Sequence, residues 1–253
     1  MKYKVILHES WMGDTLFAAN VVKNISNLGI EIVLVHKWKF MNKLLDLFEI
    51  KHNHIDIFEG DYQIINYSSR IDPYENPIID YAKSFNIEGI NINDIIKFNP
   101  LNLEKLDKES YITYENDWQS RTKLDVNYII SVLKNNIKCV PIGGDRFTED
   151  NEAIINSAKL LTNAKFHLGI IAGTTNLTTF LNTKTIGLSD HLFNFYVNQH
   201  GHGTNRTMSC EEFLIEFKPF PHNWADKKHI TCHPNITENE YIKLVLDEIK
   251  RIN

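Results

Sequence analysis

The chain has 253 residues, of which 43% are hydrophobic and 23% charged, and it carries a formal net charge of −5. This balance is typical of a globular protein, and it argues against a protein that holds nucleic acid mainly through a basic surface. The three cysteines show no CxxC spacing, so we expect neither a disulfide framework nor a zinc knuckle, and a reducing cytoplasm is the expected location. The apolar stretch near the amino terminus spans about five residues, too short for a signal sequence or a membrane span, and no transmembrane segment is predicted.

The first half of the chain alternates between strand-like and helix-like patterns. Residues 5–7 form a short apolar run, and hydrophobic residues then recur at helical spacing over 18–25 before Gly29. The next predicted elements are strand 32–35, a helix through 40–47, strands 55–58 and 63–66, and a short helix over 78–85. This alternation predicts a parallel sheet with helices outside it.

The same alternation restarts after residue 110. The predicted elements are strand 111–114, helix 125–134, strand 138–142, helix 151–161, strand 166–169, a helix from about 175 to 181, and strand 185–188. Residues 190–235 read as irregular and are rich in His, Asn and aromatic side chains, so we expect loops there. Thr237 and Glu240 form a capping-box pattern ahead of an apolar stripe over 242–252, which predicts a final helix.

Two such series predict an α/β protein with two facing Rossmann-like lobes, each a parallel sheet with helices on both faces. We place the first lobe over residues 1–109, the second over residues 110–235, and a C-terminal helix over residues 236–253. A single large doubly wound sheet is the alternative.

The segment most informative about function covers residues 166–188. A predicted strand leads to Gly173, which can adopt backbone conformations closed to other residues, and the small Thr174 and Thr175 then open a helix. The first N–H groups of a helix have no internal partners, so they can bind an anion such as a diphosphate. A tight turn followed by an ordinary capped helix is the alternative interpretation.

This segment resembles the signature of glycosyltransferase family 9, the heptosyltransferase-like enzymes of the GT-B fold. In that signature a strand, a glycine-containing turn and a small-residue helix hold the donor pyrophosphate. Gly169 and Gly173 stand where the motif has its two glycines, and residues 185–188 match the strand that follows. The resemblance therefore implies a nucleotide-sugar site in the second lobe.

Three positions depart from the family motif. Ile171, Ala172 and Asn176 stand where the family usually has Asp, Ser or Thr, and His. The amide of Asn176 can still donate a hydrogen bond, but it carries no charge.

The amino-terminal Gly13 and Asp14 also resemble the family, in which Gly-Asp follows the first strand and opens the first helix. The resemblance implies that Gly13 contacts the donor, and that Asp14 faces the cleft as the general base that takes the proton of the acceptor hydroxyl. The residues alone leave a structural explanation open, since an Asp in the first turn also caps a helix and compensates its dipole.

Two loops of the second half fit the same interpretation. Arg121 and Lys123 resemble the family's basic loop, which neutralises donor phosphates without a metal. Gly143 and Gly144 follow a buried-looking strand, where a GT-B nucleotide site also draws backbone contacts. Solvated surface charges and an ordinary glycine turn are the alternative explanations.

The histidines between residues 200 and 233 invite a metal interpretation. His200 and His202 have a His-x-His spacing, but no acidic partner or second ligand pair stands at a recognised distance. We therefore expect no metal there, and favour a surface loop or a glycine-rich loop that touches the substrate.

The sequence as a whole predicts a metal-independent hexosyl- or heptosyltransferase without a cofactor. Its partners would be a nucleotide-sugar donor and a glycan or other hydroxyl acceptor. A non-catalytic module of the same shape, which binds a nucleotide or a protein, is the alternative, because the second-lobe motif has lost its Asp and His. A Rossmann-type oxidoreductase is disfavoured, since no Gly-x-Gly-x-x-Gly follows the first strand.

Overall fold

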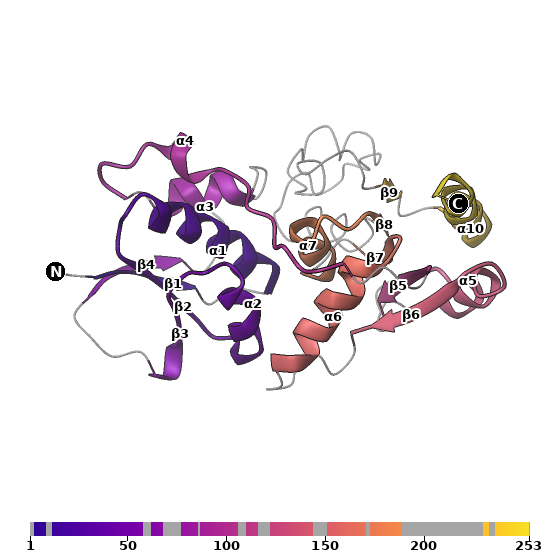
Figure 1. The fold of residues 1–253 in the computed structure, drawn as a ribbon. Coiled ribbons are helices and arrows are strands. Elements are labelled where there is room, and N and C mark those ends of the chain that lie inside the picture. The colour runs from indigo at the N-terminus through magenta and orange to yellow at the C-terminus, as the bar shows by residue number, and fades with distance from the viewer. Residues whose placement is uncertain are drawn as a thin grey trace. The chain divides into compact units, whose positions relative to one another are not determined.

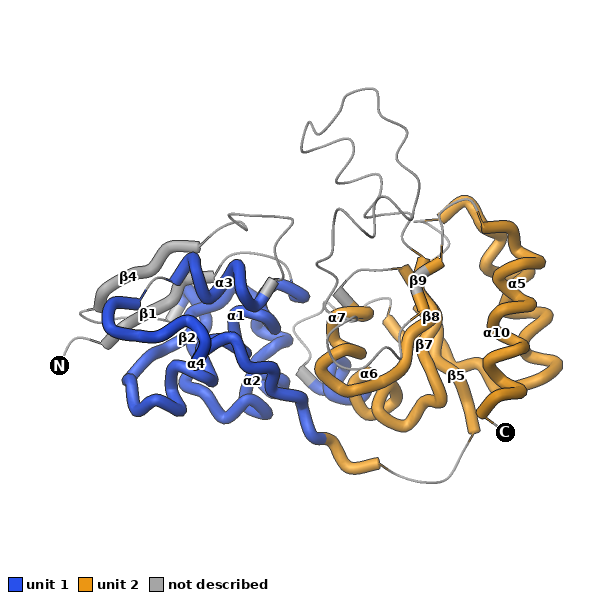
Figure 2. Tube along the Cα trace, turned by 90° about the horizontal axis from the view of Figure 1, so that it is seen from above, with its two compact units in different colours: residues 1–102, 146–156, 217–221 blue, residues 103–145, 157–216, 222–253 orange. Residues whose placement is uncertain are grey.

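The computed structural model describes residues 3–8, 12–57, 62–67, 77–85, 87–105, 110–115, 122–143, 151–170, 173–188, 230–232 and 236–252. The chain folds into two compact units, which Figure 2 shows in different colours. Unit 1 comprises residues 1–102, 146–156 and 217–221, and unit 2 comprises residues 103–145, 157–216 and 222–253.

Unit 1 contains a parallel sheet with the strand order β3-β2-β1-β4 (Figure 1). Its strands are β1 (Tyr3–His8), β2 (Ile32–His36), β3 (His52–His54) and β4 (Tyr62–Tyr67). Its helices are α1 (Met12–Asn27), α2 (Asn42–Asp46), α3 (Pro77–Phe85) and α4 (Ile92–Ile95), with single 3₁₀ turns η1 (Lys39–Met41) and η2 (Ile55–Ile57).

The local sequence explains most of these elements. Strand β2 is buried along its whole length, which matches its uninterrupted Ile-Val-Leu-Val run and is typical of a parallel strand covered on both faces. Helix α1 ends before Gly29, whose φ of 79° is unstrained only for glycine. The buried Asn24 of α1 donates its amide to the carbonyl oxygens of Ile95 and Lys97, at 2.9 and 2.7 Å, and so ties α1 to the α4 segment.

The predicted strand over 55–58 is wrong, because β3 lies just before it and residues 55–57 form η2. The ladder with β2 ends at the pair His36 and His54. There the Nδ1 atom of His54 accepts the N–H of Asp56 at 3.2 Å, which turns the chain out of the strand.

Unit 2 contains a five-stranded parallel sheet with the order β6-β5-β7-β8-β9. The strands are β5 (Tyr111–Glu115), β6 (Lys138–Ile142), β7 (His167–Ile170), β8 (Thr185–Leu188) and β9 (Ile230–Cys232). The helices beside this sheet are α5 (Val126–Leu133), α6 (Asn151–Asn163), α7 (Gly173–Phe180) and α10 (Glu238–Ile252), and residues 151–156 of α6 count with unit 1. In Figure 2, α5 and α10 cover one face of this sheet, and α6 and α7 cover the other.

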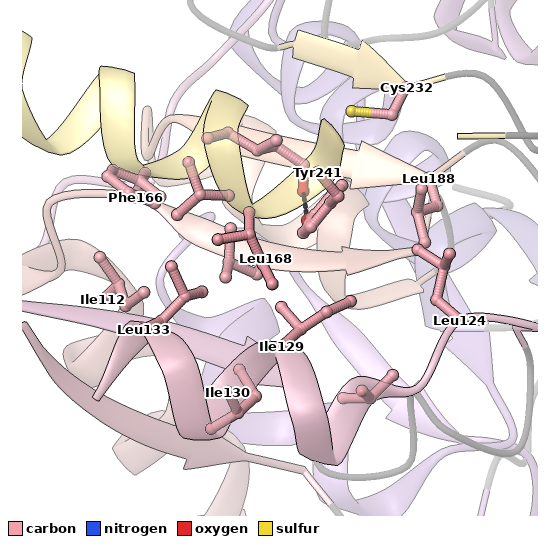
Figure 3. Packing of buried hydrophobic residues seen from close by; sticks show 14 of the residues in the cluster. Ile112, Leu124, Ile129, Ile130, Leu133, Phe166, Leu168, Leu188, Cys232 and Tyr241 are labelled. Atoms are coloured by element: carbon pink, nitrogen blue, oxygen red, sulfur yellow. Dashed lines mark hydrogen bonds between the residues drawn. The ribbon is translucent and has the colours of Figure 1, made fainter. Parts of the chain in front are cut away.

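The apolar core of unit 2 lies between the sheet and the helices α5 and α10 (Figure 3). Leu168 of β7, Ile129 of α5 and Tyr241 of α10 are completely buried in it. The Tyr241 hydroxyl donates to the carbonyl oxygen of Ile186 at 2.8 Å, so the polar tip of this ring is satisfied inside the cluster. Complete burial of one such side chain contributes roughly 1.5–3 kcal/mol, and this face therefore stabilises the unit.

The carboxyl-terminal part of the chain corrects one prediction and confirms another. Residues 190–235 were predicted to be irregular, yet they contain β9, which pairs with β8. The capping box is confirmed, because the Glu240 carboxylate accepts the Thr237 N–H at 2.9 Å and the Thr237 hydroxyl accepts the Glu240 N–H at 3.4 Å. Among the described helices, none combines the length and apolar character that a membrane crossing requires.

Candidate functional site

The β7–α7 junction, which we define as Ile170 at the end of β7 and the first turn of α7, contains the predicted strand and helix. Gly173 is already the first helical residue, so it does not supply a left-handed turn. Thr174 and Thr175 are 4% and 1% exposed. They lie in the first turn of α7, as predicted, and the Thr175 hydroxyl donates back to the carbonyl oxygen of Ile170. The threonine thus binds the helix to the strand that precedes it.

A buried carboxylate lies at the same edge of the sheet. Glu115 is the last residue of β5, the neighbour of β7, and it is only 1% exposed. Its Oε2 atom accepts the N–H of Ile170 at 3.3 Å. The sequence analysis missed Glu115, although an acidic residue directly after the apolar run 111–114 was a signal that could have been followed.

A histidine and a glycine complete this arrangement. His167 is fully buried, and its Nδ1 atom lies 3.1 Å from the Thr113 hydroxyl. A Cβ atom added at Gly169 would lie 3.0 Å from both Glu115 Oε2 and His167 Nε2. Gly169 therefore leaves the space that these two polar side chains occupy.

These residues belong to a polar layer on the sheet face that α6 and α7 cover. Thr178 of α7 and Thr185 of β8 are hydrogen-bonded through their hydroxyls at 2.7 Å in the same layer. We define the polar layer as Thr113, Glu115, His167, Thr175, Thr178 and Thr185, all of which are at most 1% exposed. Burial of a carboxylate and an imidazole costs free energy, so such a group next to a strand end is typical of a functional site.

Several predicted residues share this edge of unit 2. Gly143 directly follows β6, is half-buried and has a φ of 94°, a conformation that favours glycine. Lys123 is exposed in the segment before α5, and Asn176 is half-buried in α7. Because β6, β5 and β7 are adjacent and parallel, their carboxyl ends lie along one edge of the sheet.

Other predicted residues lie elsewhere. Gly13 is buried and Asp14 half-buried in the first turn of α1, which belongs to unit 1 and follows the inner strand β1. The carboxyl end of an inner parallel strand is a common place for ligands in α/β folds. The residues outside the described parts of the chain are Arg121, Gly144, Ile171, Ala172, His200 and His202.

A second polar cluster, which the sequence analysis also missed, lies at the carboxyl edge of the unit 1 sheet. The register aligns His8, His36 and His54, the last residues of β1, β2 and β3. His36 Nε2 lies 3.3 Å from His52 Nδ1, and His52 Nε2 lies 2.9 Å from the Asp46 carboxylate. We call His36, His52 and His54 the histidine cluster.

Hydrogen bonds orient two of these rings. The Nδ1 atom of His36 accepts the Trp38 N–H at 3.3 Å, and His54 donates from Nε2 to the Lys37 carbonyl oxygen at 3.0 Å. Burial, together with the nearby His52 and His54, lowers the pKa of His36 from 6.5 to about 3. Within the described residues, no group of three or more His, Cys, Asp or Glu is arranged to hold a metal ion.

No family model and no curated protein matches the chain. Solved structures do. E. coli ADP-heptose LPS heptosyltransferase II is 11% identical, with a TM-score of 0.61 over 99% of each chain. E. coli heptosyltransferase WaaC with ADP is 12% identical, with a TM-score of 0.57 over 99% of each chain. The chain has the fold of the heptosyltransferases.

Two further structures agree with this fold. The glycosyl transferase family 9 protein from Veillonella parvula is 10% identical, with a TM-score of 0.51 over 99% of this chain and 98% of that one. TibC from enterotoxigenic E. coli, an iron-containing dodecameric glycosyltransferase, has 13% identity and a TM-score of 0.52 over 75% of this chain. The chain spans only 60% of the length of TibC, which has also been solved with ADP-D-β-D-heptose. The predicted GT-B fold class, with its parallel sheets, and the resemblance to family 9 are thus confirmed at the level of the heptosyltransferase fold.

Proposed function

We propose that this chain is a glycosyltransferase that moves a sugar from a nucleotide-sugar donor to a hydroxyl acceptor, without a resident cofactor. The observation that carries the proposal is the β7–α7 junction, a buried strand that leads into a helix of small residues within a heptosyltransferase fold. Two of the similar structures hold ADP or ADP-D-β-D-heptose, which supports a nucleotide diphosphate as the ligand class.

The start of α7 supplies the chemistry for a diphosphate. The first turn of this helix contains no acidic residue, so its backbone N–H groups and dipole can attract an anion without competition from the helix itself. Lys123 lies in the segment between β5 and α5. We assign to Lys123, together with Arg121, the stabilisation of the negative charge on the leaving nucleoside diphosphate. No metal is needed for this stabilisation.

Asp14 is the residue that we assign to the acceptor. It lies in the first turn of α1, just after the inner strand β1. Ligands of α/β proteins commonly bind at the carboxyl ends of such strands. As general base it would take the proton of the acceptor hydroxyl while the hydroxyl oxygen attacks the anomeric carbon, and the nucleoside diphosphate would leave.

A non-catalytic nucleotide-binding module of the same fold is the second candidate. The half-buried Asn176 favours it, because this side chain cannot carry the charge of the histidine in the family motif. Nucleotide binding is common to both candidates, whereas release of a nucleoside diphosphate is expected only from the transferase.

The test is a calorimetric titration of the purified chain with ADP, GDP, CDP and UDP, followed by an assay for release of the tightest binder from its nucleotide-sugars. We expect one nucleoside diphosphate to bind and its sugar donor to be turned over. A chain that binds none of the four contradicts the proposal, and a chain that binds one but never releases it from any donor supports the non-catalytic module.

A further inference from the structure

The backbone of Ile170 is held from two sides at the β7–α7 junction. Its N–H is bonded to the Glu115 carboxylate of β5, and its carbonyl oxygen accepts the hydroxyl proton of Thr175 of α7. One residue thus connects two strands and a helix through side chains. The two peptide groups on either side of the Ile170 Cα atom are each held by one of these bonds, so neither can rotate without the loss of a buried hydrogen bond.

The Glu115 contact takes the place of an ordinary ladder bond. The register of β5 with β7 ends at the pair Tyr114 and Leu168, two residues before Ile170. Beyond that point a side chain, and not the β5 backbone, accepts the strand N–H. On the β5 side the strand end is therefore held by one carboxylate, which can be replaced without a change of the main chain, while β8 pairs with it on the other side.

A buried carboxylate is a costly way to satisfy one amide. Glu115 is 1% exposed, and an ionised group at such a position destabilises the fold unless hydrogen bonds compensate it. The neighbouring chain makes room for it, because any side chain at Gly169 would meet Glu115 Oε2 at 3.0 Å. A residue that is accommodated in this way at a strand end is typical of a functional site.

We propose that Glu115 and Thr175 are positioning residues for the donor: by clamping Ile170 they fix the direction in which the first N–H groups of α7 point. The inference rests on the proposed function and deepens it, since neither side chain touches the diphosphate. An anion site made of backbone donors binds well only if those donors are already oriented in the free protein. The free energy of binding is then not reduced by the cost of ordering them.

We call the two side-chain hydrogen bonds to Ile170, from Glu115 and from Thr175, the clamp. The clamp requires a hydrogen-bond acceptor at position 115, but it does not require the negative charge of Glu115. The amide oxygen of a glutamine can accept the Ile170 N–H as well, and its neutrality removes a negative charge from the neighbourhood of a bound diphosphate. Glu115→Gln therefore keeps the affinity for the nucleotide or raises it, whereas Glu115→Ala lowers it. In the same way Thr175→Ser keeps the hydroxyl, and Thr175→Val removes it at constant shape.

Thr178 provides the matched control. It lies on the same helix and is fully buried, and its hydroxyl donates to the carbonyl oxygen of Thr175 at 2.6 Å and is bonded to the Thr185 hydroxyl at 2.7 Å. Thr178→Val therefore removes hydrogen bonds from the same helix and polar layer, while the Thr175 hydroxyl keeps its acceptor on Ile170. Thr175→Val and Thr178→Val are expected to lower the melting temperature to a similar extent.

The experiment measures the Kd of the tightest of ADP, GDP, CDP and UDP by calorimetry for the wild type and the five variants, with circular dichroism to check folding. We expect Kd to rise about tenfold in Thr175→Val and Glu115→Ala and to stay within about twofold of wild type, or fall, in Thr175→Ser, Glu115→Gln and Thr178→Val. With the sugar donor, KM should rise by the same factor in Thr175→Val while kcat changes little.

The possible failures are distinguishable. A wild type that binds none of the four nucleotides overturns the proposed function and this inference with it. A wild type that binds, with Thr175→Val equal to it or with Thr178→Val as weak as Thr175→Val, overturns the inference alone. If Glu115→Ala does not fold, the two Thr175 variants and Thr178→Val still decide the outcome.

Discussion

Acidification from pH 7 to pH 5 should destabilise unit 1 through His36. Burial and the neighbouring His52 and His54 lower the pKa of this ring to about 3, while the hydrogen bond to the Trp38 backbone opposes the shift. The Nδ1 atom already accepts the Trp38 N–H at 3.3 Å, so a proton on that nitrogen would break the contact. The folded unit therefore keeps His36 neutral at pH 5.

The magnitude follows from the two pKa values. In the unfolded chain His36 binds a proton below its ordinary pKa of 6.5, and in the folded chain it does so only near pH 3. The contribution of His36 to the free energy of unfolding is therefore fully present above pH 6.5. It is lost progressively as the pH falls from 6.5 towards 3. Each pH unit in this window is worth about 1.4 kcal/mol, which gives a loss of about 2 kcal/mol at pH 5.

Other titratable groups lie around His36, and the assay must separate their contributions from that of His36. His52 and His54 face His36 from β3, Asp46 of α2 is bonded to His52, and His8 is the register neighbour on β1. The matched variant is His36→Asn, whose side-chain oxygen can accept the Trp38 N–H but does not titrate. It retains the contributions of all the surrounding groups.

The assay is hydrogen exchange of the β2 peptide amides at pH 7 and pH 5, corrected for intrinsic rates and converted to free energies of opening. The wild type should lose about 2 kcal/mol more than His36→Asn between the two pH values. Parallel losses in the two proteins would refute the reasoning, because His36 would then bind its proton equally in the folded and unfolded states.

Further predictions concern the site and the core. Asp14→Asn should lower turnover by about 10²–10⁴-fold with the nucleotide Kd unchanged, as measured by diphosphate release beside calorimetry, and equal turnover would remove Asp14 from the mechanism. Lys123→Ala should weaken nucleoside diphosphate binding about tenfold, and an unchanged titration curve would end that assignment. Tyr241→Phe removes the buried hydrogen bond to the Ile186 carbonyl oxygen and should cost about 1–2 kcal/mol in urea unfolding; a cost near zero would mean that the hydroxyl contributes nothing to stability. Glu248→Gln weakens the buried ion pair with Lys184 and should cost about 1–3 kcal/mol in the same assay, whereas a gain in stability would show that desolvation outweighs the attraction.

The sequence predicted the strands that consist of apolar runs and failed where the run was short or polar. Strand β2 and strand β8 were placed within a residue, because a buried parallel strand reads as continuous Val, Ile and Leu. Strand β3 is three residues with two histidines, and β9 is three residues in an irregular region, so neither gives a hydrophobic signal. The strand order of both sheets depends on pairing between distant segments, which no local pattern contains.

The site divides in a similar way. The strand and helix around Gly173 follow from local residue types, and the sequence predicted both. The burial of Glu115 depends on the strand beside it, and in the sequence it reads like any acidic residue at a strand end. Thr175 was predicted to open the helix and lies in its first turn, but its hydrogen bond to Ile170 depends on a close approach of the strand and the helix, a distance that the sequence does not give.

Strand β7 shows why stability and function can be separated in unit 2. Leu168 points into the apolar cluster beneath α5 and α10, whereas His167 and Gly169 belong to the opposite face with the polar layer. Because side chains alternate along a strand, one four-residue segment serves both faces, and a shift of register by one residue would exchange them. Substitution of Leu168 should therefore lower stability with little specific effect on nucleotide affinity, whereas Thr175→Val should weaken nucleotide binding beyond the effect of Thr178→Val, which lowers stability to a similar extent. This contrast separates a polar layer that positions a ligand from one that only fills space.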